Sequence, residues 1–168
     1  MTSSGTATVT LPTDTRIMIT REFDAPARLV WKAYTTPDLI RRWWGGERGT
    51  VTVADVDLRV GGRWRYALVA NGGFEVAFHG EYREIVPAER LVNTEVYEGI
   101  PDAEEQAALV TATLTEKDGR TLLEVLVEHR DKAGRDAHID SGMEGGMQEA
   151  IDALEHVAVD LAAVERAG

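Results

Sequence analysis

The last quarter of the chain carries the feature that most restricts the fold, which is a single apolar stripe at helical spacing. Apolar residues recur there at steps of three and four positions: Met143, Met147, Ala150, Ile151, Leu154, Val157, Ala158, Leu161 and Val164. This spacing predicts one long helix with one apolar side, and Ser141-Gly-Met-Glu144 fits a capping box at its start. Such a helix needs a second layer to cover that side.

The middle of the chain supplies the second layer. Apolar and polar residues alternate over much of the stretch from Thr50 to His129, and the strongest turn signals are Gly61-Gly62, Asn71-Gly72 and Lys117-Asp-Gly119. Together with a strand over residues 15–23, this pattern predicts a curved antiparallel sheet of six or seven strands. The fold class is therefore α+β.

Two short helices are expected between the first strand and the meander. Asp24-Ala-Pro26 opens the first, and Thr36-Pro37-Asp38 opens the second, with Thr36 as the N-cap. Residues 1–14 are predicted to be a flexible tail that is not a signal peptide, and residues 15–166 a single domain. A long helix crossing the concave side of the sheet would leave room for a cavity between the two layers, because side chains need not fill that space.

Composition excludes several classes of function. The net charge of −11 argues against binding to nucleic acids and to anionic membrane surfaces, and no apolar run is long enough to span a membrane. The chain has no cysteine, which fits a cytoplasmic location. Its four histidines lack the spacing of metal ligands, and no phosphate-binding or dinucleotide motif is present, so we expect no metal and no cofactor.

The stretch RRWWGG at residues 41–46 places two tryptophans side by side. Adjacent residues on a helix point about 100° apart, so the two rings have different surroundings. We expect Trp43 to seal the second short helix onto the sheet. Trp44 either belongs to the core or faces a binding space, and Gly45 should end the helix in a left-handed conformation.

Four segments together resemble a known family: REFDAPARLVWKAYTTPDLIRRWWGG, DLRVGGRWRY, FHGEYREIVPAERLV and GMEGGMQEAIDALEHV. They are similar to the bacterial branch of the START-like superfamily, also called SRPBCC or birch-pollen-allergen-like. Within it they resemble the group named for the activator of the ATPase of the ninety-kilodalton heat-shock chaperone. The resemblance runs from about Thr15 to Leu161. It implies a helix-grip fold with a deep, mostly apolar pocket, in which relatives bind lipids, polyketides or hormones and some cyclise polyketides.

The resemblance and the strand pattern together suggest a set of pocket residues. Trp44 would lie at the rim, and the helix would contribute a lid of Met143, Met147 and Ile151. The sheet would contribute Trp64, Tyr66, Phe78 and Tyr82. Each of these residues could equally be ordinary core, but as a set they predict a shared pocket. Gly145 and Gly146 reflect close packing, a later helix start, or room for a ligand.

Three functions remain open on this reading. The first is binding of a small hydrophobic or aromatic molecule. The second is a cyclase or hydrolase in which Asp57, Glu95 or a tyrosine carries a proton. The third is stimulation of a chaperone ATPase, with the chaperone as partner. A homodimer is a further open alternative, because twofold dimers are common.

Overall fold

The computed structural model describes residues 6–167, which form eight strands, four α-helices and one 3-10 helix. In chain order the elements are β1 (Thr8–Thr10), β2 (Arg16–Phe23), α1 (Ala27–Thr35), α2 (Pro37–Trp43), β3 (Gly49–Val56), β4 (Arg63–Ala70), β5 (Glu75–Val86), β6 (Arg90–Tyr97), η1 (Ala103–Gln106), β7 (Ala108–Lys117), β8 (Arg120–Glu128), α3 (Lys132–Asp140) and α4 (Met143–Ala167).

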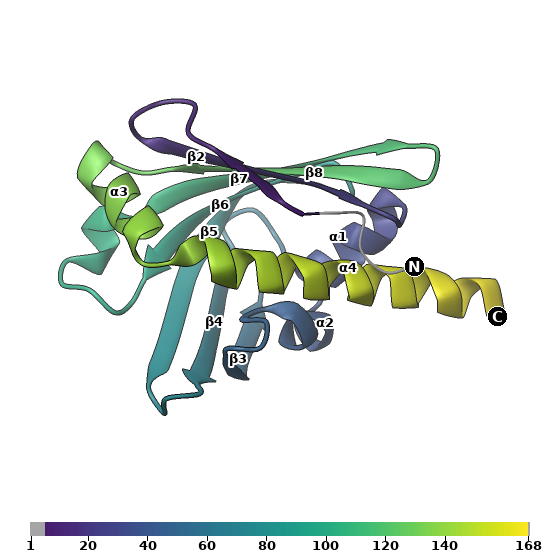
Figure 1. Cartoon of the computed structure of the whole chain (residues 1–168), viewed down its shortest axis with the longest axis horizontal. Coiled ribbons are helices and arrows are strands. Elements are labelled where there is room, and N and C mark those ends of the chain that lie inside the picture. Colours follow the sequence, from purple (N-terminus) through teal and green to yellow (C-terminus); the bar gives the residue numbers. More distant parts are fainter. Residues whose placement is uncertain (1–5, 168) are drawn as a thin grey trace.

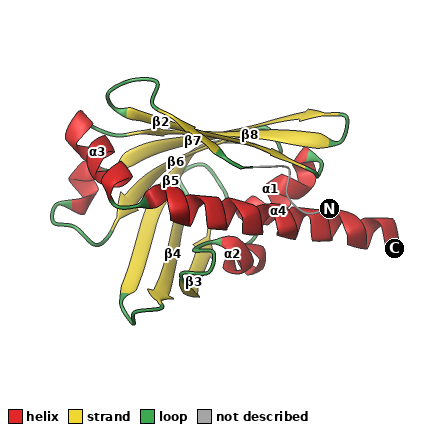
Figure 2. Ribbon diagram, in the orientation of Figure 1, coloured by secondary structure: helices red, strands yellow, loops and turns green. Residues whose placement is uncertain are grey.

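The strands form one antiparallel sheet in the order β1-β2-β8-β7-β6-β5-β4-β3. Helix α4 crosses one side of this sheet, with α1 and α2 packed beside it (Figures 1 and 2). This arrangement confirms the predicted α+β helix-grip fold. The hairpins follow from the turn residues, because Gly61, Gly73 and Gly119 adopt positive φ angles that other residues rarely tolerate.

The sheet has one or two strands more than the six or seven predicted. Strand β1 lies within the segment predicted to be a flexible tail, where Val9 pairs with Ile19 of β2. The backbone of Ala7 also exchanges two hydrogen bonds with the side-chain amide of Gln148 on α4, at 3.0 and 2.7 Å. Three residues are too few to show a strand period, so the edge strand depends on its neighbours. Residues 1–5 of the predicted tail lie outside the described residues.

Helix α3 was not predicted, and its presence makes the predicted capping box wrong. Asp131 caps α3 by accepting a hydrogen bond from the Gly134 backbone at 2.7 Å. Ser141 donates its hydroxyl to the His138 carbonyl at 2.6 Å, so its side chain serves the end of α3 rather than the start of α4. Gly142, with a φ of 83°, then separates the two helices.

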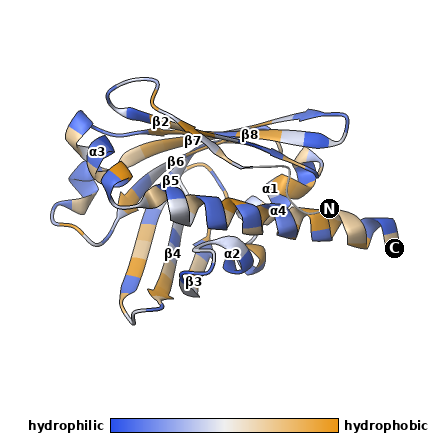
Figure 3. Ribbon diagram, in the orientation of Figure 1, coloured by the Kyte–Doolittle hydropathy of each residue, from blue (hydrophilic) through white to orange (hydrophobic). Residues whose placement is uncertain are grey.

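The middle of α4 forms the centre of the core. Four of its buried residues belong to the predicted apolar stripe: Ile151, Leu154, Val157 and Ala158. Apolar and polar residues alternate along the helix, as expected when only one side is covered (Figure 3). Among residues 6–167, no helix combines the length and apolar character that crossing a membrane requires.

A buried ion pair fixes α4 to β2. The Arg21 guanidinium lies 2.7 Å from Glu155, and neither side chain is more than 1% exposed. Arg21 also reaches Asp152 at 2.7 Å, and Glu155 accepts a hydrogen bond from the Asp24 backbone at 2.9 Å. These bonds compensate the cost of burying two charges, and they set the position of the helix along the sheet.

Candidate ligand-binding site

Four aromatic side chains, here called the inner aromatic cluster, meet on the concave side of the sheet: Trp44, Trp64, Tyr66 and Phe78. The Trp44 ring contacts Tyr66 and Phe78 edge-on, with centroids 5.5 and 5.9 Å apart. Trp64 lies 4.7 Å from Tyr66. Except for Trp64, which is buried, these rings are only half-buried. Large aromatic groups at the centre of a fold therefore keep accessible surface.

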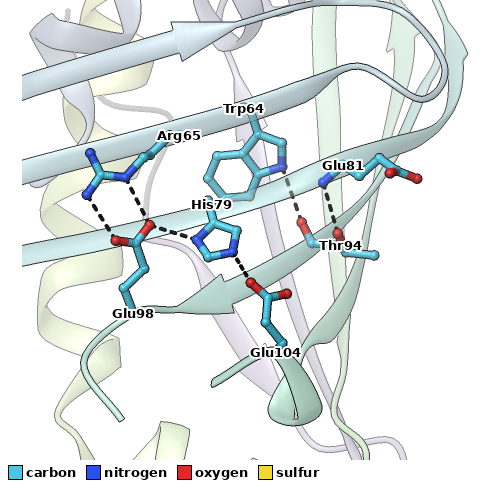
Figure 4. Close-up of polar contacts among 7 residues, drawn as sticks. All are labelled: Trp64, Arg65, His79, Glu81, Thr94, Glu98 and Glu104. Atoms are coloured by element: carbon cyan, nitrogen blue, oxygen red, sulfur yellow. Dashed lines mark hydrogen bonds and ion pairs between the residues drawn. The ribbon is translucent and has the colours of Figure 1, made fainter. Parts of the chain in front are cut away.

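The position of Trp64 depends on a glycine. Its indole nitrogen donates a hydrogen bond to the Thr94 carbonyl at 3.2 Å, reaching from β4 across β5 to β6 (Figure 4). Gly80 lies between them on β5, where a Cβ atom would stand 1.9 Å from the Thr94 oxygen and 2.6 Å from the indole nitrogen. The β5–β6 pairing is interrupted at this point, and the Thr94 hydroxyl accepts the Glu81 backbone N–H instead, at 2.9 Å.

Glu95 faces the same space as the inner aromatic cluster. The β5–β6 register places it beside Gly80, on the side of the sheet that carries Phe78 and Tyr82. It is half-buried, and burial raises the pKa of its carboxyl group to about 7. Among the described residues, no side chain or backbone group forms a hydrogen bond or ion pair with the carboxyl group of Glu95.

Two tyrosines surround this carboxylate from other elements. Burial first, and then the charge of Glu95, raise the pKa of Tyr34 on α1. The pKa of Tyr66 is raised by burial, by Tyr82 and Tyr34, and by Glu95. Tyr34 is not recognisable as a site residue from the sequence, because its spacing on the first helix indicates an apolar side but not what that side contacts.

The helix contributes a less tightly packed wall at its N-terminal end. Met143 and Met147 are half-buried, whereas Ile151 one turn further on is 8% exposed and belongs to the core. These three residues are four positions apart and therefore share one face of the helix. Nearby on the helix, Gln148 contacts Ala7 and Glu149 contacts Arg48. Both methionines pack against the same core as the inner aromatic cluster, and their flexible side chains can adapt to irregular surroundings.

The paired glycines on both sides of this space allow close approach of a loop and a helix. At Gly46 a Cβ would lie 2.6 Å from the Glu149 side chain, and at Gly145 it would lie 2.8 Å from the Arg48 guanidinium. Arg48 pairs with Glu149 at 3.1 Å. Of the alternatives for Gly145, close packing is the one that these contacts support, and the packed group is an arginine.

Trp43 is buried in the core, as expected, and it also joins α2 to α1: its indole N–H donates to the Ala33 carbonyl at 2.9 Å and its ring stacks on Tyr34 at 5.6 Å. One sequence-based expectation needs correction. Asp57, proposed as a proton carrier, lies in the β3–β4 connection and pairs with Arg59 at 2.9 Å. Its side chain is 53% exposed, so it does not lie in the interior.

Two surface hollows lie away from the inner aromatic cluster. One, of about 450 Å³, lies between the Arg48–Glu149 pair and the β4–β5 turn, where Phe74 is 63% exposed. The other, of about 490 Å³, lies between the β5–β6 turn and the end of β7. Neither is lined by the residues predicted to form the pocket.

The histidines lie outside the concave space. His79 points from the opposite side of the sheet and joins Glu98 at 2.7 Å and Glu104 at 2.6 Å (Figure 4). His129 and His138 form a hydrogen bond with each other at 2.9 Å. Within residues 6–167, no group of three or more acidic or histidine side chains is arranged to hold a metal ion.

The chain matches a known protein family. Residues 24–158 match the family described as activator of Hsp90 ATPase homolog 1-like protein. The chain belongs to this family. The match includes the inner aromatic cluster, Glu95 and most of α4, so the family assignment covers the whole candidate site. It confirms the resemblance inferred from the sequence.

Solved structures agree with the family assignment. A crystal structure of a Rhodobacter sphaeroides protein is 28% identical, with a TM-score of 0.81 over 94% of this chain and 99% of that one. An Arthrobacter aurescens protein solved by NMR is 24% identical, with a TM-score of 0.81 over 91% of each chain. A Mycobacterium smegmatis protein is also 24% identical, with a TM-score of 0.77 over 94% of this chain and 97% of that one. A comparison with curated proteins finds no match.

Proposed function

We propose that the protein binds a small hydrophobic or aromatic molecule between the sheet and α4. The observation that supports this most directly is the half-buried state of Trp44, Tyr66 and Phe78, together with Met143 and Met147 on the helix. Phenylalanine is among the residue types most often fully buried, so the half-buried Phe78 keeps apolar surface that a ligand could cover. A ligand that covered them would gain about 25 cal/mol for each Å² of apolar surface removed from water.

Polar groups at one end of the space would orient the ligand. Glu95 lies close enough to Tyr34 and Tyr66 for its charge to raise the pKa values of both, and Trp44, Trp64 and Phe78 lie nearby. An apolar site with a few convergent polar groups is the usual arrangement of a small-molecule site. The ligand would therefore combine an apolar body with at least one polar group.

The test is a binding titration with N-phenyl-1-naphthylamine, a neutral probe whose fluorescence rises in apolar surroundings. We expect binding by the wild-type protein and at least about tenfold weaker binding by Met147→Trp, because the larger side chain fills the space. Val164→Trp is the matched control, since Val164 lies on the same helix and is 70% exposed. Absence of binding to wild type, or equal binding by both variants, would contradict the proposal and favour a surface-mediated role such as the chaperone activation in the family's description.

A second candidate is an enzyme that uses the same site, and Glu95 is the observation that favours it. A half-buried carboxyl group with a pKa of about 7 can both accept and donate a proton near neutral pH. Aryl esters that fit the aromatic space would test for hydrolysis. We expect a rate that depends on a group of pKa near 7 and falls at least about a hundredfold in Glu95→Gln. Equal rates for the two proteins would exclude Glu95 as a catalytic residue.

A further inference from the structure

Glu95 is a carboxylate for which the fold supplies no positive charge. On β7 its pairing partner is Ala108, and on β5 its neighbour is Gly80. The titratable groups that face it are Tyr34 of α1 and Tyr66 of β4, with Tyr82 of β5 next to Tyr66. No lysine or arginine among the described residues forms an ion pair with its carboxyl group, and burial is the cause of its raised pKa.

Glu155 is a second carboxylate on the concave side, and in its case the fold supplies a positive charge. Glu155 is fully buried, and Arg21 lies 2.7 Å away with its side chain also buried. Removing a carboxylate from water without a partner is costly, and a stable fold normally supplies one. Glu95 instead lies on the side of the sheet that carries the aromatic residues, where burial favours its neutral form, so a cation entering the site would stabilise its charged form.

The surroundings also restrict what that partner is. Trp44, Trp64 and Tyr66 present aromatic faces and edges within one cluster beside Glu95. Aromatic faces attract cations, and the attraction strengthens when water is excluded. An anionic ligand would be repelled by Glu95. A neutral ligand would leave the carboxylate without a counter-charge.

We infer that the preferred ligand is an organic cation, an aromatic or aliphatic molecule whose protonated amine pairs with Glu95 while its apolar part lies against Trp44, Tyr66 and Phe78. This inference rests on the proposed binding function and adds the chemical class of the ligand. The net charge of −11 adds a favourable long-range field for a cation entering the site. A quaternary ammonium would use the aromatic faces alone and lose the hydrogen bond to the carboxylate.

The experiment compares three probes with the same ring: 2-naphthylmethylamine, 2-naphthylmethanol and 2-naphthoate. Dissociation constants are measured from the quenching of tryptophan fluorescence at about pH 8.5 and about pH 5. At the higher pH the amine should bind at least about tenfold more tightly than the alcohol, and the carboxylate weakest. At the lower pH the preference for the amine should shrink, because protonation removes the charge of Glu95.

Two variants separate this inference from the proposed function. Glu95→Gln should bind the alcohol like wild type but lose the preference for the amine. Asp57→Asn removes an exposed carboxylate outside the interior and should keep the preference, which controls for net charge. If the alcohol binds as tightly as the amine to wild type at the higher pH, or if Glu95→Gln keeps the preference, the cation inference is wrong and the proposed function stands. If none of the three probes binds, the proposed function fails too.

Discussion

The indole nitrogen of Trp64 and the carbonyl oxygen of Thr94 form a 3.2 Å hydrogen bond across a strand to which neither residue belongs. The bond passes over Gly80, where any side chain would collide with both partners. It fixes the Trp64 ring over Gly80, and the strand register places Glu95 of β6 next to that glycine. One glycine thus determines where an aromatic ring and an acid meet.

Substitution Gly80→Ala should destabilise the protein strongly. A Cβ atom 1.9 Å from a backbone oxygen requires movement of β5 or β6, and we expect a loss of more than about 3 kcal/mol in the free energy of unfolding. Urea denaturation measures it. Gly146→Ala is the contrasting variant, since its Cβ would meet Arg48 at an ordinary 3.7 Å inside a helix. It should be neutral or stabilise by up to about 1 kcal/mol, and a similar loss in both variants would refute the steric argument.

Removing the carboxylate of Glu155 should cost about 3–5 kcal/mol, because it takes away the buried counter-charge of the Arg21 guanidinium. Glu155→Leu followed by thermal and urea denaturation measures the loss. In the double variant Arg21→Met/Glu155→Leu, much of the stability should return, since no charge is left buried. Glu165→Gln, which breaks an exposed pair with Arg28, should cost less than about 1 kcal/mol. The prediction fails if the double variant is no more stable than the single one.

The stability of the protein should decrease between about pH 4.5 and pH 7 through Glu95. Its pKa is raised from 4.5 to about 7 by burial, so the folded chain holds this proton more tightly than the unfolded chain. The contribution is fully present below pH 4.5 and is lost as the pH rises through 7. Glu95→Gln should match wild type near pH 4 and be more stable near pH 8, by up to about 3 kcal/mol. Parallel curves of melting temperature against pH for the two proteins would rule this out.

The His79 cluster should contribute stability that is lost at alkaline pH. Partial burial opposes the charge on His79, but hydrogen bonds to Glu98 and Glu104 outweigh it and raise the pKa. Stability from this group is therefore present below the unfolded pKa of 6.5 and lost as the pH rises through the higher folded value. Because the cluster is partly exposed, we expect less than about 1 kcal/mol. Comparing His79→Gln with the exposed His156→Gln at pH 6 and pH 9 tests this, and only the former should flatten the pH dependence.

The sequence by itself determined the architecture, because the signals for it are local. Local sequence patterns are enough to predict these elements. They are the three- and four-residue spacing of apolar residues in α4, the alternation in β4 and β5, and the turns at Asn71-Gly72 and Lys117-Asp-Gly119. The family motifs strengthen the same conclusion. Edge strand β1 and helix α3 escaped detection, since the first is three residues long and the second carries little apolar periodicity.

Only the tertiary structure decided which of the candidate residues form a site. Asp57 and Glu95 are equivalent carboxylates in the sequence, yet one pairs with Arg59 in water and the other lies among tyrosines without a cation. Trp43 and Trp44 are adjacent, yet one stacks on α1 and the other meets β4 and β5. The physical reason is that pairing, burial and ionisation depend on strand register and helix docking, which bring together residues far apart in the chain.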